Sequence, residues 1–135
     1  MSAPVIVFPD AQLATRDLLR ALLAPHEPAA TVSTRNAPTD DAGSPRPWVR
    51  VRSDPPQRTA RASATATVRI TVFADDEGAS VALALLIEGL LLAEASSDAL
   101  RGFGPVSGPA AGIDPETRAP LALLTVAARL RPRQL

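Results

Sequence analysis

The chain has 135 residues, of which 46% are hydrophobic but only 3% aromatic, so its core has to be built from Leu, Val, Ile and Ala. The 14 bases balance 14 acids, and this neutral total disfavours a protein that binds nucleic acid over its whole surface. Cysteine is absent, which excludes disulfides, thiolate chemistry and zinc sites built on Cys. We expect one domain over residues 1–135.

The N-terminal part of the sequence predicts an amphipathic helix. Residues 2–8 are apolar but have neither a basic region nor a long hydrophobic stretch, so we expect no secretory signal. A helix over residues 11–24 follows, and Pro25 ends it because proline lacks the backbone N–H that a helix needs. Its predicted buried stripe consists of Leu13, Leu18, Leu19, Leu22 and Leu23.

Short strands and long loops come next. Residues 29–35 predict a strand, and residues 36–47 predict a long loop rich in Pro, Asp and Gly. Residues 48–52 predict a second strand, in which apolar and polar side chains alternate. Residues 53–62 predict another loop, which joins this strand to an antiparallel neighbour.

The clearest pattern lies in residues 64–98. Residues 64–74 alternate with period two over a full strand length, which places these residues on one face: Ala64, Ala66, Val68, Ile70, Val72 and Ala74. The acids Asp75-Asp76-Glu77 then precede an apolar run. Acids suit a helix N-terminus because its exposed N–H groups and dipole favour negative charge, so we expect a helix from Ala79 to about residue 98.

The C-terminal part predicts two further strands. Residues 101–106 predict a short strand, residues 107–119 a loop, and residues 121–130 the last strand. One face of the last strand carries Ala122, Leu124, Val126, Ala128 and Leu130. The order α-β-β-β-α-β-β favours an α+β fold, with a mainly antiparallel sheet of about four to five strands and two helices packed on one face.

The helix predicted over residues 79–98 is apolar nearly all round, so it needs cover on more than one side. The sheet covers one side. A neighbouring copy or the segment Val5 to Phe8 covers the other, and the residues leave both alternatives open. Glu88 lies among apolar positions near the middle of this helix, which disfavours a membrane span. Because an unpaired buried carboxylate is costly, we expect Glu88 at the helix edge or paired with an arginine.

No arrangement of residues predicts catalysis, and we expect no enzyme activity, no metal and no cofactor. His26 is the one histidine, and no Ser or Asp partner can be placed beside it. The acidic clusters Asp40-Asp41 and Asp75-Asp76-Glu77 lack the spacing of a calcium-binding loop. The glycine-containing loops after residue 101 do not lie between a strand and a following helix, so they predict no phosphate site.

Arginines gather on one face of two predicted strands. Arg50 and Arg52 share a face with Trp48, and Arg69 falls on the matching face of the next long strand. One interpretation is an exposed sheet face or a surface between subunits, where Trp and Arg are favoured anchors. The other is a basic surface with an aromatic platform for nucleic acid. We favour the first, because one Trp in a neutral chain does not make a stacking groove.

The order of elements resembles that of the tail terminator (tail completion) proteins of long-tailed, non-contractile bacteriophages, with those of actinobacteriophages closest. Four features carry the resemblance over nearly the full chain. They are the helix PDAQLATRDLLRALLA, the strand PWVRVR of residues 47–52, the strand and Phe-Ala-Asp step of residues 68–75 before an Ala-rich helix, and the closing loop and strand of residues 112–131. Asp54-Pro55-Pro56 stands where the family leads us to expect a Gly-Gly turn.

The resemblance implies a structural role without catalytic residues. Such proteins form a ring, usually a hexamer, that caps the tail tube, ends tube polymerisation and provides the surface for joining the head. DNA passes through the lumen without specific binding. The implied partners are other copies of the chain, the tail tube protein and a head-side connector or stopper, with no membrane. The implied location is the tail end of a virion, assembled in the cytoplasm of a bacterial host.

Two sets of residues are expected to carry this role. The residues expected between subunits are Trp48, Arg50, Arg52, Arg69 and Glu88. The residues expected to join the ring to its partners lie in the long loops: Asn36, Asp40, Asp41, Arg46, Asp54 and Arg58. Two alternatives stay open, another head–tail connector or stopper (neck) protein and a nucleic-acid-binding module that uses the Arg-rich strands of residues 46–69.

Overall fold

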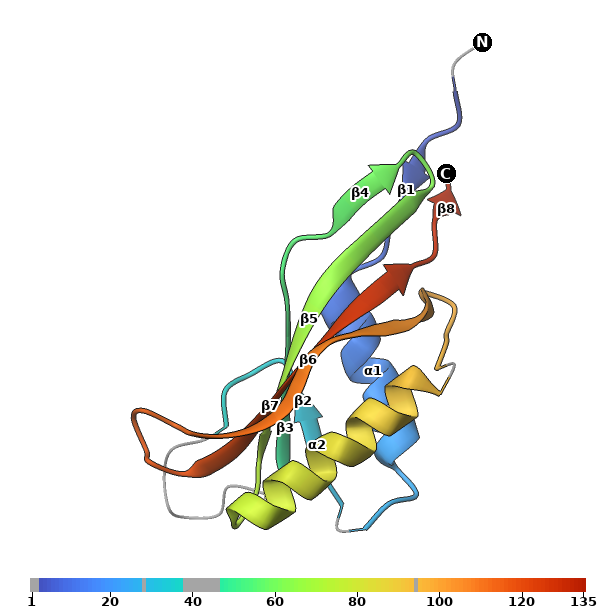
Figure 1. Cartoon of the computed structure of the whole chain (residues 1–135). Helices are drawn as coiled ribbons and strands as arrows, with labels where there is room; N and C mark the ends of the chain where they lie inside the picture. The colour runs from blue at the N-terminus through green and yellow to red at the C-terminus, as the bar shows by residue number, and fades with distance from the viewer. Residues whose placement is uncertain (1–2, 28, 38–46, 94) are drawn as a thin grey trace.

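The computed structural model describes residues 3–27, 29–37, 47–93 and 95–135 (Figure 1). The described elements are β1 (Ile6–Val7), α1 (Ala11–Leu23), β2 (Thr31–Ser33), β3 (Trp48–Ser53), β4 (Gln57–Ala60), β5 (Ser63–Phe73), α2 (Glu77–Leu92), β6 (Leu100–Ile113), β7 (Pro120–Leu130) and β8 (Arg133–Gln134). The short strands β1, β4 and β8 are additions to the predicted order.

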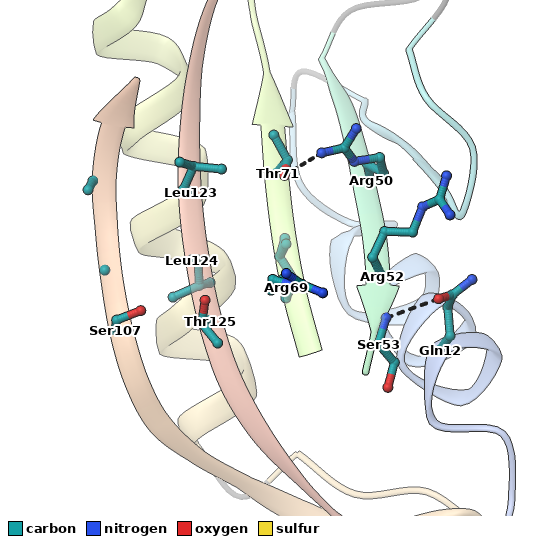
Figure 2. A pocket seen from close by; sticks show the side chains of 13 residues that line it. Gln12, Arg50, Arg52, Ser53, Arg69, Thr71, Ser107, Leu123, Leu124 and Thr125 are labelled. Carbon is teal, nitrogen blue, oxygen red and sulfur yellow. Dashed lines mark hydrogen bonds between the residues drawn. The ribbon is translucent and has the colours of Figure 1, made fainter. Parts of the chain in front are cut away.

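One sheet organises the molecule. Its strands lie in the order β2-β3-β5-β7-β6, and β4 pairs with the start of β5. All of these pairs are antiparallel except β2 with β3, which is parallel. Both helices pack on one face of this sheet, and in the described part of the chain no helix lies on the other face (Figures 1 and 2). The predicted α+β class, with two helices on one face of a mainly antiparallel sheet, is confirmed.

The core lies between the sheet and the helices, where the period-two pattern places it. Alternate residues of β5 and β7 face the helices and are almost fully buried: Ala64, Ala66, Val68, Ile70, Val72, Ala122, Leu124, Val126, Ala128 and Leu130. Leu19, Ile87 and Leu91 from the helices pack into the same cluster. Burying one such Val, Leu or Ile side chain contributes roughly 1.5–3 kcal/mol, so these two strands strongly specify which face is covered.

Helix α1 begins at a side-chain cap. The carboxylate of Asp10 accepts hydrogen bonds from the backbone N–H groups of Gln12 at 2.9 Å and Leu13 at 3.1 Å. The fully buried positions recur every four residues, at Ala11, Thr15, Leu19 and Leu23. The predicted leucine stripe is therefore partly wrong. Leu13 is 42% exposed, because two steps along a helix turn a side chain away from this row.

Helix α2 begins near the predicted place but ends early. Asp76 caps it by accepting a hydrogen bond from the N–H of Ala79 at 2.7 Å. The helix then stops at Leu92 rather than near residue 98. The following chain is held at the end of the sheet, where Arg131 N–H donates to the Ala99 carbonyl at 2.9 Å. Residues that pair with the end of the sheet in this way are not available to extend the helix by another turn.

Side chains on the outer side of α2 are exposed in the described part of the chain. Leu85 is 52% exposed, and Ala82 and Gly89 beside it are also exposed. The alternative in which Val5 to Phe8 covers this side is wrong. Strand β1 pairs with β8 at the opposite end of the molecule from the start of α2 (Figure 1).

A strand lies inside the loop predicted over residues 53–62. Strand β4 has no buried residue, so no alternation of polarity marks it in the sequence. Asp54-Pro55-Pro56 connects β3 to β4. The tight turn joins β4 to β5 instead, where Ala60 pairs with Ser63. The proline-containing link thus replaces the expected Gly-Gly turn with an extended connection.

Strand β6 continues well past its predicted end at residue 106. It reaches Ile113, and register shifts keep this glycine- and proline-containing segment paired with β7. At Gly108 the backbone has a φ of +81°, and a Cβ there would lie 2.5 Å from the Leu123 carbonyl oxygen. The composition of residues 107–113 is typical of a loop, but cross-strand pairing with β7 decides the structure.

Candidate functional site

The outer face of the sheet, which no described helix covers, carries side chains in rows across the strands. Pairing aligns three residues in each row, from β3, β5 and β7 in turn. The rows are Arg52–Arg69–Thr125, Arg50–Thr71–Leu123 and Trp48–Phe73–Leu121. Figure 2 shows the first two rows in front of the helices. The predicted common face of Trp48, Arg50, Arg52 and Arg69 therefore exists.

These rows line a hollow of about 730 Å³. We call it the arginine hollow and define it by six lining residues: Arg50, Arg52, Arg69, Ser107, Leu123 and Thr125. At one end, the Gln12 side chain of α1 accepts a hydrogen bond from Ser53 N–H at 3.0 Å, which fixes α1 against the end of β3 (Figure 2). The hollow thus combines charged, hydroxyl and apolar groups on a rigid sheet.

Arg50 is held in place by neutral partners. Its guanidinium donates to Asn36 Oδ1 at 2.8 Å and to Thr71 Oγ1 at 3.3 Å, and it lies 5.9 Å from the centre of the Phe73 ring. Its buried Nε has no hydrogen-bond partner among the described residues. Burial lowers the pKa of Arg50, and the positive charge of Arg52 lowers it further, whereas Asp114 opposes the shift. The site therefore holds positive charge that neutral groups only partly satisfy.

Arg52 and Arg69 are like charges placed directly opposite each other across β3 and β5. Such pairs are destabilising when nothing compensates them. Asp54 compensates one of them, since its carboxylate forms a salt bridge with Arg69. Within the described part of the chain, Arg52 has no ion pair. The hollow consequently has more positive charge than its own carboxylates neutralise.

Trp48 is not free to act as a stacking platform. It is half-buried, its indole N–H donates to the Arg35 carbonyl at 3.1 Å, and it lies opposite Phe73 in the neighbouring strand. The aromatic part of this face is therefore used within the chain, which weakens the interpretation as a nucleic-acid platform.

Glu88 lies apart from the arginines. It is half-buried on α2, on the helix side of the sheet, and no ion pair of the described residues involves it. Its neighbour Ile87 is fully buried, which places Glu88 beside the buried stripe. The expected position at the helix edge therefore fits, but the structure does not bring Glu88 together with the other residues expected between subunits.

The residues expected in joining loops divide into three groups. Asn36 and Asp54 contact arginines of the outer face. Arg58 lies on β4, donates to the Ile6 carbonyl at 3.0 Å and stacks 4.8 Å from the centre of the Phe8 ring, so it attaches β4 to the N-terminal segment. The remaining three lie outside the described residues: Asp40, Asp41 and Arg46.

Sequence reasoning missed two residues of this face. Leu123 is 48% exposed and lines the arginine hollow, although a leucine on the outward face of a strand was visible in the alternation. Asp114 accepts from the N–H groups of Glu116 at 2.8 Å and Thr117 at 3.3 Å. These bonds lower the pKa of Asp114, and the charge of Arg50 adds to the effect. No local pattern revealed this electrostatic influence, because Asp114 and Arg50 are far apart in sequence.

Other chemistry is sparse in the described residues. No cluster of His, Asp or Glu side chains there has the arrangement of a metal site. His26 is half-buried, and its backbone N–H donates to the Leu23 carbonyl at 3.0 Å. No described helix combines the length and apolarity that crossing a membrane takes. The arginine hollow is therefore the most distinctive feature of the described surface.

No protein-family model and no curated protein matches the chain. The fold is similar to that of a chain in a solved structure titled "Virion of native gene transfer agent (GTA) particle", with a TM-score of 0.60 and 22% sequence identity. The similarity covers 90% of this chain and 94% of that one. At this identity the likeness establishes the shared fold and leaves function to be argued separately.

Proposed function

We propose that this chain is a structural protein of a virion. The observation that carries the proposal is the fold likeness to a chain of a virion particle, which covers 90% of this chain and 94% of the other. Such coverage means that the two chains share a whole fold rather than a common motif. The surface chemistry agrees, because the described residues offer a rigid charged face rather than a nucleophile with its base.

In its finer form, the proposal is a tail terminator. Copies of the chain form a ring that caps the tail tube, ends tube polymerisation and presents a surface for joining the head. Two uncovered regions support self-association: the outer side of α2 with Leu85 exposed, and the arginine hollow on the opposite face of the sheet. Two different patches on one chain produce head-to-tail contacts, which close into a ring when the rotation between copies permits it.

Electron microscopy of the purified protein, with and without tail tubes, tests this proposal. The expected result is a closed ring at tube ends and tubes that stop growing at a fixed length. The free protein is expected to be monomeric or a mixture of monomers and rings. A stable two-fold dimer that leaves tube ends uncovered would contradict the tail role.

Binding experiments distinguish the tail terminator from two other functions, a neck protein and a nucleic-acid-binding module. A neck protein is expected to bind the head-side connector and to leave free tube ends uncapped. A nucleic-acid-binding module has one observation in its favour, the unpaired positive charge of the arginine hollow. It predicts DNA binding by the isolated protein that weakens steeply as salt rises, because bound counterions are released from the phosphates.

The joining residues remain part of the proposal. Asn36, Asp54 and Arg58 now have contacts within the chain, so their substitution tests local structure as well as joining. Replacing residues 38–44 with a short Gly-Ser link tests the loop without removing Asn36. We expect little loss of stability and a loss of tail capping or head joining in a reconstitution assay. Capping and infectious particles at normal yield would assign the loop a connecting role only.

A further inference from the structure

Two of the three arginines in the hollow have no carboxylate bound to them among the described residues. Arg50 is bound by an amide and a hydroxyl, Arg69 is bound by Asp54, and Arg52 has no ion pair among the described residues. Arginine at a partly desolvated surface favours a carboxylate or phosphate, which it binds with two parallel N–H groups. A hollow with this charge is therefore chemically suited to an acidic group from another molecule.

The start of α2 carries acidic residues that form no ion pair with any described residue. Asp75, Asp76 and Glu77 are all exposed, and no ion pair of the described residues involves them. We call these three residues the acidic tip. Asp76 accepts from the N–H of Ala79 and so caps α2, which fixes the backbone that carries Asp75 and Glu77. An ordered backbone reduces the conformational entropy that these residues lose when they bind a second surface.

One chain cannot bring these two features together. The acidic tip begins α2, which packs on the covered face of the sheet, whereas the arginine hollow lies on the opposite face (Figures 1 and 2). None of the described ion pairs joins the two. In the described residues the acidic tip and the arginine hollow thus lie unpaired with each other, and a second copy carries a complementary patch for each.

The surroundings favour a protein surface over a nucleic acid. Leu123 is 48% exposed within the hollow, and Ile113 on the adjoining strand is 64% exposed. On the tip side, Ala79 and Ala82 of α2 are exposed next to the acids. Apolar groups beside charges on both surfaces are typical of protein interfaces, in which arginine is enriched.

The edge of the sheet at β6 is a poor alternative contact. It is the last strand on its side of the sheet, and Pro105 and Pro109 within it have no N–H to donate to a neighbouring strand. These prolines disfavour continuous strand pairing between copies at this edge.

We propose that the arginine hollow of one copy receives the acidic tip of a second copy. This inference rests on the proposed ring and deepens it, since it names the two surfaces that meet between neighbouring subunits. The carboxylates of Asp75 and Glu77 lie against Arg52 and Arg50 of the next copy, and the exposed alanines of α2 pack towards Leu123. Because the two surfaces differ, each copy uses both, and the contact repeats around the ring.

The absence of cysteine permits a direct test by cross-linking. Ala79→Cys places a thiol beside the acidic tip, and Ser107→Cys places one in the arginine hollow, with both acidic and basic side chains left intact. The two variants are mixed in full-length form and treated with a short bis-maleimide. Ser63→Cys, an exposed serine at the distal hairpin of the same sheet, replaces Ser107→Cys as the matched control.

We expect the Ala79–Ser107 pair to cross-link several-fold faster than the Ala79–Ser63 pair. The difference shrinks as salt rises from 0.1 M to 1 M, where the screening length falls from about 10 Å to about 3 Å. A chain with both cysteines Ala79→Cys and Ser107→Cys gives a ladder of products that ends at a closed ring. Equal rates for the two pairs would overturn the inference.

Charge reversal provides the second arm. Arg52→Glu in the Ser107→Cys chain reduces cross-linking to the control level. Asp75→Arg with Glu77→Arg in the Ala79→Cys chain then restores it, a rescue that a folding defect cannot produce. Failure of the rescue contradicts the assigned contact.

The two proposals can fail separately. Rings on tube ends with no preferred cross-link leave the tail role intact and remove this interface. A preferred, rescued cross-link without rings on tube ends supports the contact and removes the tail role.

Discussion

The two faces of the sheet belong to the same strands but differ in burial and in charge. The face towards the helices carries fully buried aliphatic residues such as Val68, Ile70 and Val126. The outer face carries Arg52, Arg69 and Leu123 in adjacent rows, with more charge and apolar surface than the chain itself satisfies. The first face is packed within a single copy, and we propose that the second meets another copy. Substitutions on the first should therefore affect folding, and substitutions on the second should affect assembly.

The largest expected effect comes from breaking the buried face. Ile70 is fully buried at the centre of β5, so Ile70→Ala should reduce the free energy of unfolding by about 2–5 kcal/mol, through lost burial and the cavity left behind. Leu123→Ala on the outer face is the matched control and should cost less than about 1 kcal/mol. Urea denaturation of both variants measures the difference. Equal losses would contradict the division between the faces.

The next largest effect concerns the β6 backbone that borders the hollow. Gly108→Ala forces a side chain into a left-handed conformation and against the Leu123 carbonyl, so we expect a loss of roughly 1–3 kcal/mol. Gly89→Ala is the control, because nothing lies within 4 Å of its added Cβ on exposed α2. That variant should gain up to about 1 kcal/mol from helix propensity. Thermal unfolding compares the two, and a neutral Gly108→Ala would refute the close approach.

A smaller effect is expected from Asp114, which follows the end of β6. Hydrogen bonds from Glu116 and Thr117 hold its pKa below the usual value. A lowered folded-state pKa contributes stability above the unfolded-state pKa, and this contribution is lost as the pH falls through the folded-state value. Asp114→Asn should therefore show a shallower loss of stability on acidification than the unchanged protein. Identical acid profiles would contradict this account.

The smallest effect on folding is expected at Glu88. It lies half-buried beside the buried stripe of α2 without a described ion pair, so Glu88→Leu should change the free energy of unfolding by only about 0.5 kcal/mol. If the uncovered side of α2 meets another copy, the same variant should alter the yield of rings in electron micrographs. Outright unfolding of Glu88→Leu would show that the carboxylate supports the subunit core.

Much of the buried face was predictable from the sequence, because the pattern that marks it involves neighbouring residues. Residues 48–52, 64–74 and 121–130 alternate in polarity with the period of a strand, and that period predicted both the core and the common face of Arg50, Arg52 and Arg69. The period is a property of neighbouring residues, so a single sequence contains it.

The other features of the fold and of the hollow depend on contacts between residues that are far apart in sequence. Strand β4 is exposed on both faces, and residues 107–113 have the composition of a loop, so neither shows a strand pattern. Strands β1 and β8 form only because the two ends of the described chain meet. The contact between Asn36 and Arg50 and the shape of the hollow likewise arise from pairing across the sheet.

The central claim is that the outer face of the sheet lies between copies of the chain. A cryo-electron microscopy map of the protein bound at tail-tube ends tests it most directly. The account predicts a closed ring in which Arg52 and Leu123 of each copy are buried against the start of α2 of the next. A ring in which these side chains face open solvent, or line the lumen against DNA, would contradict it.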